Sequence, residues 1–259
     1  MSECHDRETP PEVSLDHLFC GDLLCRQHRQ GYRFSVDAVL LAHFVDPRRS
    51  PTLLDLGTGC GIIPLILYYR HGHQLAKVTA IEAQQGLARL AKENLEQIAP
   101  QKTCSVIHGE VQKIAALVQP ESFDGVVCNP PYYPVKAGRG CSRTEADLAR
   151  HEVLGRLEDF LAAASFAVKN RGRVYLVYPA ERSAELLVLA SRERLQAKRV
   201  QYIYSYPDDR QNARLLLLEC VKNGGPGVEI LAPFHIYGEK NGAFSAQMEH
   251  FYAPNRIDR

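Results

Sequence analysis

The sequence predicts an α/β fold with a mostly parallel, seven-stranded sheet whose last strand is antiparallel. Three observations lead to this prediction. Short apolar segments alternate with helical segments from residue 52 to residue 195, which is the pattern of strands and crossover helices in a parallel sheet. A glycine-rich turn directly follows the first of these strands. Two further strands, at 198–204 and 214–221, have no helix between them, so we expect them to pair antiparallel.

Each element follows from a local pattern. A small β-hairpin is expected, with strands at 18–20 and 23–25 joined by Gly21-Asp22. A helix is expected at 36–45, with Ser35 as its N-cap. Short apolar runs bounded by turn residues predict the other strands, at 52–56, 77–81, 103–107, 123–128 and 173–178. Helical spacing of apolar residues predicts helices at 62–69, 86–98, 111–118, 156–168 and 180–195. Residues 129–149 show no periodicity and are interpreted as a long functional loop.

The chain divides into four segments. Residues 1–14 are polar and are expected to be disordered or extended. Residues 15–50 are expected to form a hairpin-and-helix extension that covers the ligand site. The main domain is expected at 51–222, followed by a tail at 223–259 that packs on it.

Composition restricts the functional class. The chain has 259 residues, of which 45% are apolar and 24% charged, as in ordinary soluble domains. No apolar run approaches the ~18 residues of a membrane span, and the N-terminus lacks a secretory signal, so we expect a cytoplasmic protein. The eight cysteines are therefore expected to be reduced thiols, without a metal site. A net charge of +1 argues against a protein that coats nucleic acid. Nothing demands an oligomer, so a monomer or weak dimer is expected.

A glycine-rich turn follows the strand expected at 52–56. Residues 55–61 read Asp-Leu-Gly-Thr-Gly-Cys-Gly, and glycines let a backbone approach a ligand closely. The dinucleotide fingerprint is Gly-x-Gly-x-x-Gly, whereas here the third glycine comes one residue early and an acid precedes the first. This pattern favours S-adenosylmethionine (SAM), a cation, over a pyrophosphate; an NAD-binding module and a turn without a ligand are the alternatives. The predicted SAM contacts in the turn are Asp55, Gly57, Thr58, Gly59 and Gly61.

The next two strands also end in acidic residues. Glu82 lies about twenty residues after the glycines, where a carboxylate can bond both ribose hydroxyls, and Ala83 follows it in the predicted site. Gly109 and Glu110 end the third strand, where a side chain can meet the adenine amine.

The fourth strand is followed directly by Asn129-Pro130-Pro131-Tyr132. An exocyclic amine or amide nitrogen is a poor nucleophile because its lone pair is delocalised. The Asn129 side-chain oxygen and the Pro130 carbonyl can accept its two N–H bonds and direct the lone pair at a methyl group. Pro131 stiffens the loop, and Tyr132 offers a face on which a planar base can stack. The sequence thus predicts a planar-nitrogen methyltransferase, with Asn129 contacting the cofactor as well.

These motifs resemble the tRNA1(Val) (adenine-37-N6)-methyltransferase family, over roughly residues 15–252. The resemblance also rests on Gln27, on Gly31-Tyr32-Arg33-Phe34-Ser35-Val36-Asp37, and on segments at 149–152, 215–219 and 233–237. It implies a Rossmann-like class I SAM methyltransferase fold and an enzyme that methylates N6 of an adenine in tRNA. It further implies that part of the cofactor wall is formed by Tyr32, Phe34, Ser35 and Asp37.

The substrate surface is less well defined. Basic side chains follow the catalytic motif and could meet phosphates, so the candidate substrate residues are Tyr133, Lys136, Arg139 and Arg143. Three tyrosines at positions 202, 204 and 206 share one strand face, which we interpret as sheet packing, with a stacking surface as the alternative.

Three other functions stay open. Neighbouring families with the same catalytic motif methylate glutamine N5 in proteins, or adenine N6 in rRNA and DNA. The chain shows no separate N-terminal helical domain for a protein substrate. A SAM-binding subunit without catalysis is the third alternative, against which the intact Asn129–Tyr132 motif argues.

Overall fold

The structure, a computed structural model, describes residues 12–29, 33–98, 103–132, 155–208, 210 and 212–254. In these ranges the main sheet consists of nine strands: β3 (Thr52–Leu56), β4 (Lys77–Glu82), β5 (Cys104–His108), β6 (Phe123–Cys128), β7 (Val168–Pro179), β8 (Leu195–Tyr204), β9 (Leu215–Lys222), β10 (Glu229–Ile230) and β11 (Phe234–His235). The helices are α1 (Val36–Phe44), α2 (Ile62–His71), α3 (Gln85–Glu96), α4 (Ile114–Leu117), α6 (Leu157–Ala167), α7 (Ser183–Arg192) and α8 (Ala246–Tyr252).

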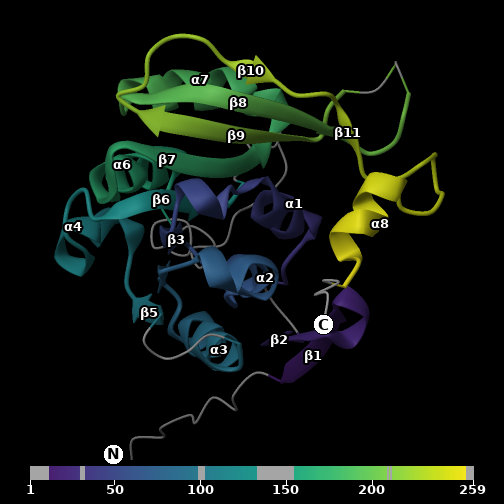
Figure 1. The fold of residues 1–259 in the computed structure, drawn as a ribbon, viewed down its shortest axis with the longest axis horizontal. Helices are drawn as coiled ribbons and strands as arrows, with labels where there is room; N and C mark the ends of the chain where they lie inside the picture. The colour runs from purple at the N-terminus through teal and green to yellow at the C-terminus, as the bar shows by residue number, and fades with distance from the viewer. Residues whose placement is uncertain are drawn as a thin grey trace, which may run out of the picture.

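The strand order is β10-β8-β9-β7-β6-β3-β4-β5, with β11 also paired to β8 (Figure 1). Strands β3 to β7 run parallel, and β9 lies antiparallel between β7 and β8. The mostly parallel sheet and its antiparallel last strand are therefore confirmed. Two short strands of the tail, β10 and β11, extend the expected seven strands because they pair with the outer edge of β8, whose backbone groups would otherwise lack partners.

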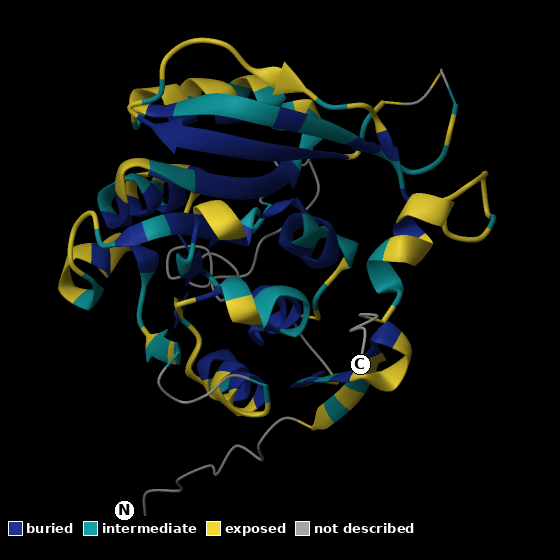
Figure 2. Ribbon diagram, viewed as in Figure 1, coloured by how far each residue is buried: buried dark blue, intermediate teal, exposed yellow. Residues whose placement is uncertain are grey.

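Helices cover both faces of the sheet. Helices α1, α2 and α3 bury one apolar cluster against it, while α6 and α7 bury a second cluster on the opposite face. Figure 2 shows the central strands as buried along most of their length. Strands buried on both faces explain why the sequence of these segments is apolar without alternation. Since β3, β4, β6 and β7 are parallel, their carboxyl ends meet at one sheet edge.

The N-terminal hairpin is longer than the sequence predicts. Strands β1 (Val13–Leu18) and β2 (Leu23–His28) pair antiparallel over six residues each, so positions 13 and 14 belong to the hairpin. Phe19 and Cys20 were expected in the first strand but take positive φ angles of 52° and 57° in the connection. The Phe19 ring is buried and stacks on Tyr69 of α2 with centroids 4.6 Å apart. That packing fixes the turn on the main domain.

The C-terminal tail is tied to α1. The Phe251 ring of α8 stacks on His43, with centroids 4.0 Å apart, and the Phe251 carbonyl lies 3.0 Å from His43 Nε2. Burial lowers the pKa of His43 to about 3, so the ring is neutral at physiological pH. Phe234 is buried as expected for a packed tail, whereas Ile230 on β10 is 62% exposed.

No helix within the described ranges has the length and apolar character needed to cross a membrane.

A buried carboxylate joins the antiparallel part of the sheet to α1. Glu219 on β9 is 4% exposed and pairs with Arg173 of β7 and, at 3.0 Å, with Arg199 of β8. Arg199 also donates a 2.6 Å hydrogen bond to the Phe44 carbonyl and lies over the Phe44 ring. One acid thus holds three strands and a helix together.

We expect Glu219→Ala to lower the free energy of unfolding by about 2–3 kcal/mol, because two partly buried guanidinium groups lose their counter-charge. Urea denaturation followed by circular dichroism measures this loss. Glu93→Ala is the matched control: Glu93 and Arg89 are an exposed helical pair 4.0 Å apart, whose removal should cost about 0.5 kcal/mol or less. Equal losses of unfolding free energy in the two variants would show that Glu219 does not hold these elements together.

Candidate active site

The glycine turn between β3 and α2 has a backbone that only glycine adopts without strain. Gly57, Gly59 and Gly61 have φ angles of 70°, 61° and 83°. A Cβ at Gly57 would lie 3.0 Å from the Phe160 ring, and one at Gly61 would lie 3.2 Å from Ala91 of α3. The first two glycines therefore admit close approach at the sheet edge, while Gly61 lets α2 and α3 pack.

Backbone donors of this turn are satisfied within the chain. The N–H groups of Gly57 and Thr58 donate to the Ile81 carbonyl at 2.9 and 3.0 Å. The Gly59 N–H donates to Glu82 Oε2 at 2.9 Å, and the Gly61 N–H to the Thr58 carbonyl at 3.0 Å. A pyrophosphate site needs such N–H groups free to face the anion. These four N–H groups of the turn are therefore not free to bind an anion.

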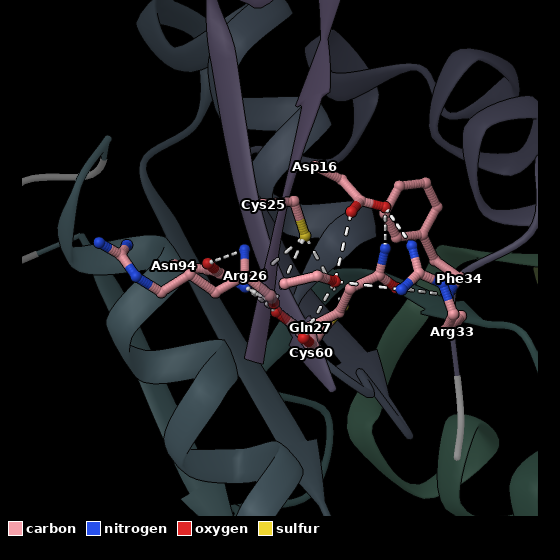
Figure 3. Close-up of polar contacts among 9 residues, drawn as sticks. Asp16, Cys25, Arg26, Gln27, Arg33, Phe34, Cys60 and Asn94 are labelled. Carbon is pink, nitrogen blue, oxygen red and sulfur yellow. Dashed lines mark hydrogen bonds and ion pairs between the residues drawn. The ribbon is translucent and has the colours of Figure 1, made fainter. Parts of the chain in front are cut away.

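Asn94 of α3 holds the turn from behind (Figure 3). The side chain is fully buried; its Nδ2 donates to the Cys60 and Arg26 carbonyls, both at 2.8 Å, and its Oδ1 accepts from the Arg26 N–H at 2.8 Å. Cys25 and Cys60 lie beside it with their sulfur atoms 3.8 Å apart, both as free thiols. One amide thereby joins strand β2 of the N-terminal hairpin to the glycine turn.

Gln27 of β2 connects the hairpin to the start of α1 (Figure 3). Its buried side chain accepts a hydrogen bond from the Phe34 N–H at 3.2 Å and donates to Asp16. Arg33 pairs with the same Asp16 at 2.7 Å. These contacts set the path of the segment that leads into α1, at Ser35.

A cavity lies at the carboxyl edge of the sheet, beside the glycine turn. Its volume is about 90 Å³, and it is partly open to solvent. A nucleoside-sized ligand would therefore also fill the open part. The lining residues come from the β3–α2 turn, the end of β4 and the start of α3, the segment after β5, the end of β6, and α6: Gly57, Gly59, Ile81, Glu82, Ala83, Gln84, Leu87, Val111, Asn129, Pro131 and Phe160.

The Asn-Pro-Pro-Tyr segment reaches this cavity from the end of β6. Cys128, the last residue of β6, pairs in register with Leu56 of β3, which places Asn129 next to the glycine turn. Asn129 Oδ1 accepts a 2.9 Å hydrogen bond from the Tyr132 hydroxyl. Pro130 is buried, and the Tyr132 ring meets Tyr178 of β7 edge to face at 5.6 Å. The loop is thus held with the Asn129 amide oriented.

Two carboxyl groups are buried at the site. Asp55 is 2% exposed; its Oδ2 accepts from the Thr58 hydroxyl at 2.5 Å, and its Oδ1 has no hydrogen-bond partner among the described residues. Burial raises the pKa of Asp55 to about 7, with Glu82 adding repulsion. Glu82 accepts from the Gly59 and Gln84 N–H groups, and burial raises its pKa as well.

The cavity brings together only part of the predicted site. Gly57, Gly59, Glu82, Ala83, Asn129 and Pro131 line it. Asp55 and Thr58 bond to each other and are not part of the lining, Gly61 packs on α3, and Gly109 packs on Leu117. Glu110 pairs with Lys113 at 3.0 Å instead of lining the cavity. Phe34, Ser35 and Asp37 lie at the start of α1, away from the lining. Five predicted residues fall outside the described ranges: Tyr32, Tyr133, Lys136, Arg139 and Arg143.

Known proteins are similar to this chain in sequence and in fold. The Methyltransferase small domain family matches residues 35–196, more than half of the chain. A tRNA1(Val) (adenine(37)-N6)-methyltransferase of Shewanella sp. (strain MR-4) is 30% identical over 209 residues, which cover 80% of this chain and 82% of that protein. The chain belongs to this methyltransferase family. A protein of the same name from Pasteurella multocida is 31% identical over 62% of this chain and 66% of that protein.

Solved structures support the fold of the methyltransferase. A predicted O-methyltransferase of Agrobacterium tumefaciens superposes with a TM-score of 0.64 at 22% identity, covering 83% of this chain and 95% of that one. A T. thermophilus 16S rRNA methyltransferase in complex with AdoMet and guanosine gives a TM-score of 0.54 at 18% identity, over 82% of this chain and 50% of that one. The class I methyltransferase fold is therefore confirmed.

Five lining residues of the methyltransferase were not predicted as site residues from its sequence: Ile81, Gln84, Leu87, Val111 and Phe160. Gln84, Leu87 and Val111 follow β4 and β5 closely, so proximity to strand ends could have indicated them. Phe160 comes from α6, and only the packing of that helix beneath Gly57 brings it to the cavity. Among the described residues, no cluster of three or more His, Cys, Asp or Glu side chains could hold a metal ion.

We expect Asn94→Leu to lower the free energy of unfolding by about 3 kcal/mol, because three backbone groups of the hairpin and the glycine turn lose their partner. Urea denaturation measures the loss. Gln97→Leu, one turn further along α3 and more exposed, is the control and should stay within about 0.5 kcal/mol of the natural protein. A neutral Asn94→Leu variant would show that the turn does not depend on this amide.

Proposed function

We propose that this methyltransferase transfers a methyl group from SAM to N6 of an adenine in tRNA. One observation carries the proposal: Asn129 and Pro131 of the catalytic motif line the same cavity as Gly57, Gly59 and Glu82. The names of the relatives support an adenine in tRNA as the substrate.

The chemistry of the cavity suits SAM. When bound, SAM supplies a methyl group on a positively charged sulfur. Asp55 keeps one buried carboxylate oxygen without a partner in the described part of the chain, and such an orphaned acceptor is stabilised by a nearby cation. Glu82 uses its oxygens to fix the turn but retains lone pairs toward the cavity, where ribose hydroxyls can donate. With four N–H groups of the turn already bonded, a nucleoside that carries no phosphate is favoured over a dinucleotide.

Asn129 and Pro130 supply the acceptors that the target nitrogen needs. An adenine N6 amine is planar, and its lone pair is delocalised into the ring. Asn129 Oδ1 and the Pro130 carbonyl can each accept one of its N–H bonds, which favours the geometry in which the lone pair points at the methyl group. The Tyr132 hydroxyl already donates to Asn129 Oδ1 and so holds that oxygen in place. Both acceptors are neutral amides, so the proton lost after transfer leaves to water.

Glutamine N5 in a protein and adenine N6 in rRNA or DNA present the same planar NH₂ group. Incubation with labelled SAM and, separately, bulk tRNA, ribosomes, DNA and release factor distinguishes them. We expect label in the tRNA pool. Label in protein alone would contradict the tRNA assignment while leaving the acceptor mechanism in force.

We expect Asn129→Ala to lower kcat for methyl transfer by about 100-fold or more, because one of two acceptors for the reacting amine is lost. Calorimetry should find SAM affinity within a few fold of the natural protein. Tyr132→Phe serves as the companion variant, since it keeps the ring and removes only the hydroxyl that orients Asn129, and it should lower kcat less. Near-normal turnover by Asn129→Ala would refute the acceptor mechanism.

We expect SAM affinity to rise by about tenfold between pH 6 and pH 8, because the carboxyl of Asp55, with its pKa raised to about 7, must lose its proton before its Oδ1 can stabilise a cation bound near the turn. The affinity should level off above pH 8, where the carboxylate is already formed. Calorimetry across this range measures the effect. Asp55→Asn should bind more weakly and lose the pH dependence, whereas Glu110→Gln, outside the cavity, should keep it. If the pH dependence of SAM affinity persists in Asp55→Asn, another group causes it.

A further inference from the structure

A second, larger hollow lies at the same sheet edge. It is an open groove of about 930 Å³ at the carboxyl ends of β7 and β8, the end of β8 where β11 pairs in Figure 1. Tyr202, Tyr204 and Tyr206 line it together with Pro179, Arg210 and Arg214. All three tyrosines are half-buried, and the Tyr204 ring also contacts His235 at 5.7 Å. Sheet packing therefore accounts for only part of their surface.

The groove continues the face on which the catalytic motif lies. Tyr132 meets Tyr178 edge to face, and Tyr178 pairs in register with Leu216 of β9, which pairs with Tyr202 of β8. These residues form one row across the sheet. Pro179, the residue after Tyr178, already lines the groove. The Arg182 guanidinium lies 4.9 Å over the Tyr178 ring and is held there by Glu185.

Charge in the groove suits an anionic chain. Arg214 is exposed, and its guanidinium has no hydrogen bond or ion pair to any residue that the structure describes. Arg210 also lines the groove and is paired with Asp208 at 3.3 Å. Glu181 is the acidic side chain of the lining. Aromatic faces beside an unpaired arginine are the combination that binds single-stranded nucleic acid, through base stacking and phosphate contact.

We infer that this groove binds single-stranded RNA nucleotides that flank the target base, with bases stacked on Tyr204 and Tyr206 and a phosphate on Arg214. The inference rests on the proposed function, because it takes RNA as the substrate. Three strand spacings of ~4.8 Å separate β6 from β8, so Asn129 and the groove are about 15 Å apart across the sheet. That distance corresponds to about four stacked nucleotides.

The test measures binding of unmodified bulk tRNA and of a labelled single-stranded RNA by fluorescence anisotropy, alongside methyl transfer. We expect Tyr204→Leu and Tyr206→Leu each to raise the Kd for RNA about tenfold, and the Phe variants to stay within about twofold, since the phenyl ring still stacks. Arg214→Gln should lower the slope of log Kd against log salt concentration by about one. Arg192→Gln, an exposed arginine of α7 outside the groove, is the control.

In methyl transfer, the Leu variants should raise KM for tRNA while kcat at saturating tRNA and the affinity for SAM stay unchanged, which also shows that the variants fold. If the variants keep their RNA affinity and their KM while the protein methylates tRNA, the groove does not bind RNA. The proposed function would still hold. Methyl transfer to protein but to no RNA would defeat the proposed function itself. Loss of protein methylation in the Tyr204→Leu and Arg214→Gln variants would then assign the groove to a polypeptide and overturn the inference.

Discussion

The site depends on one constraint: hydrogen bonds from β4 and α3 hold the backbone of the glycine turn in place. Four backbone groups of the turn are hydrogen-bonded. The Ile81 carbonyl accepts from two N–H groups, Glu82 accepts from a third, and Asn94 donates to the carbonyl of Cys60. The positive φ angles of the three glycines make these bonds possible. The N–H groups bonded in this way are not available to a pyrophosphate.

The same bonds connect the turn to distant parts of the chain. Glu82 belongs to β4, and Asn94 belongs to α3 and reaches the N-terminal hairpin through Arg26. The hairpin in turn fixes the start of α1 through Gln27. One set of hydrogen bonds therefore joins the glycine turn, the hairpin and the start of α1.

Much of the fold could be predicted from the sequence because parallel strands buried on both faces leave a strong apolar signal. The predicted bounds of β3 and β6 coincide with the observed ones. β7 instead begins at Val168, since the polar residues 169–171 extend the strand at an exposed end. The short strands of the tail were missed because two-residue pairings along an edge carry no periodicity. Phe160 was missed because helix packing, not spacing, brings it beneath the turn.

The sequence by itself determined the order of strands and helices, the glycine turn and the position of Asn129 after the fourth strand. These features depend on local backbone chemistry and on strand polarity, and residues close together in the sequence determine both. Only the tertiary structure decided which acids face the cavity: Glu82 lines it, Asp55 bonds to Thr58 outside the lining and Glu110 turns to Lys113. It also decided that Tyr132, Tyr178 and Tyr202 share one row. Side-chain direction and the alignment of strands distant in sequence arise from packing, which no local pattern records.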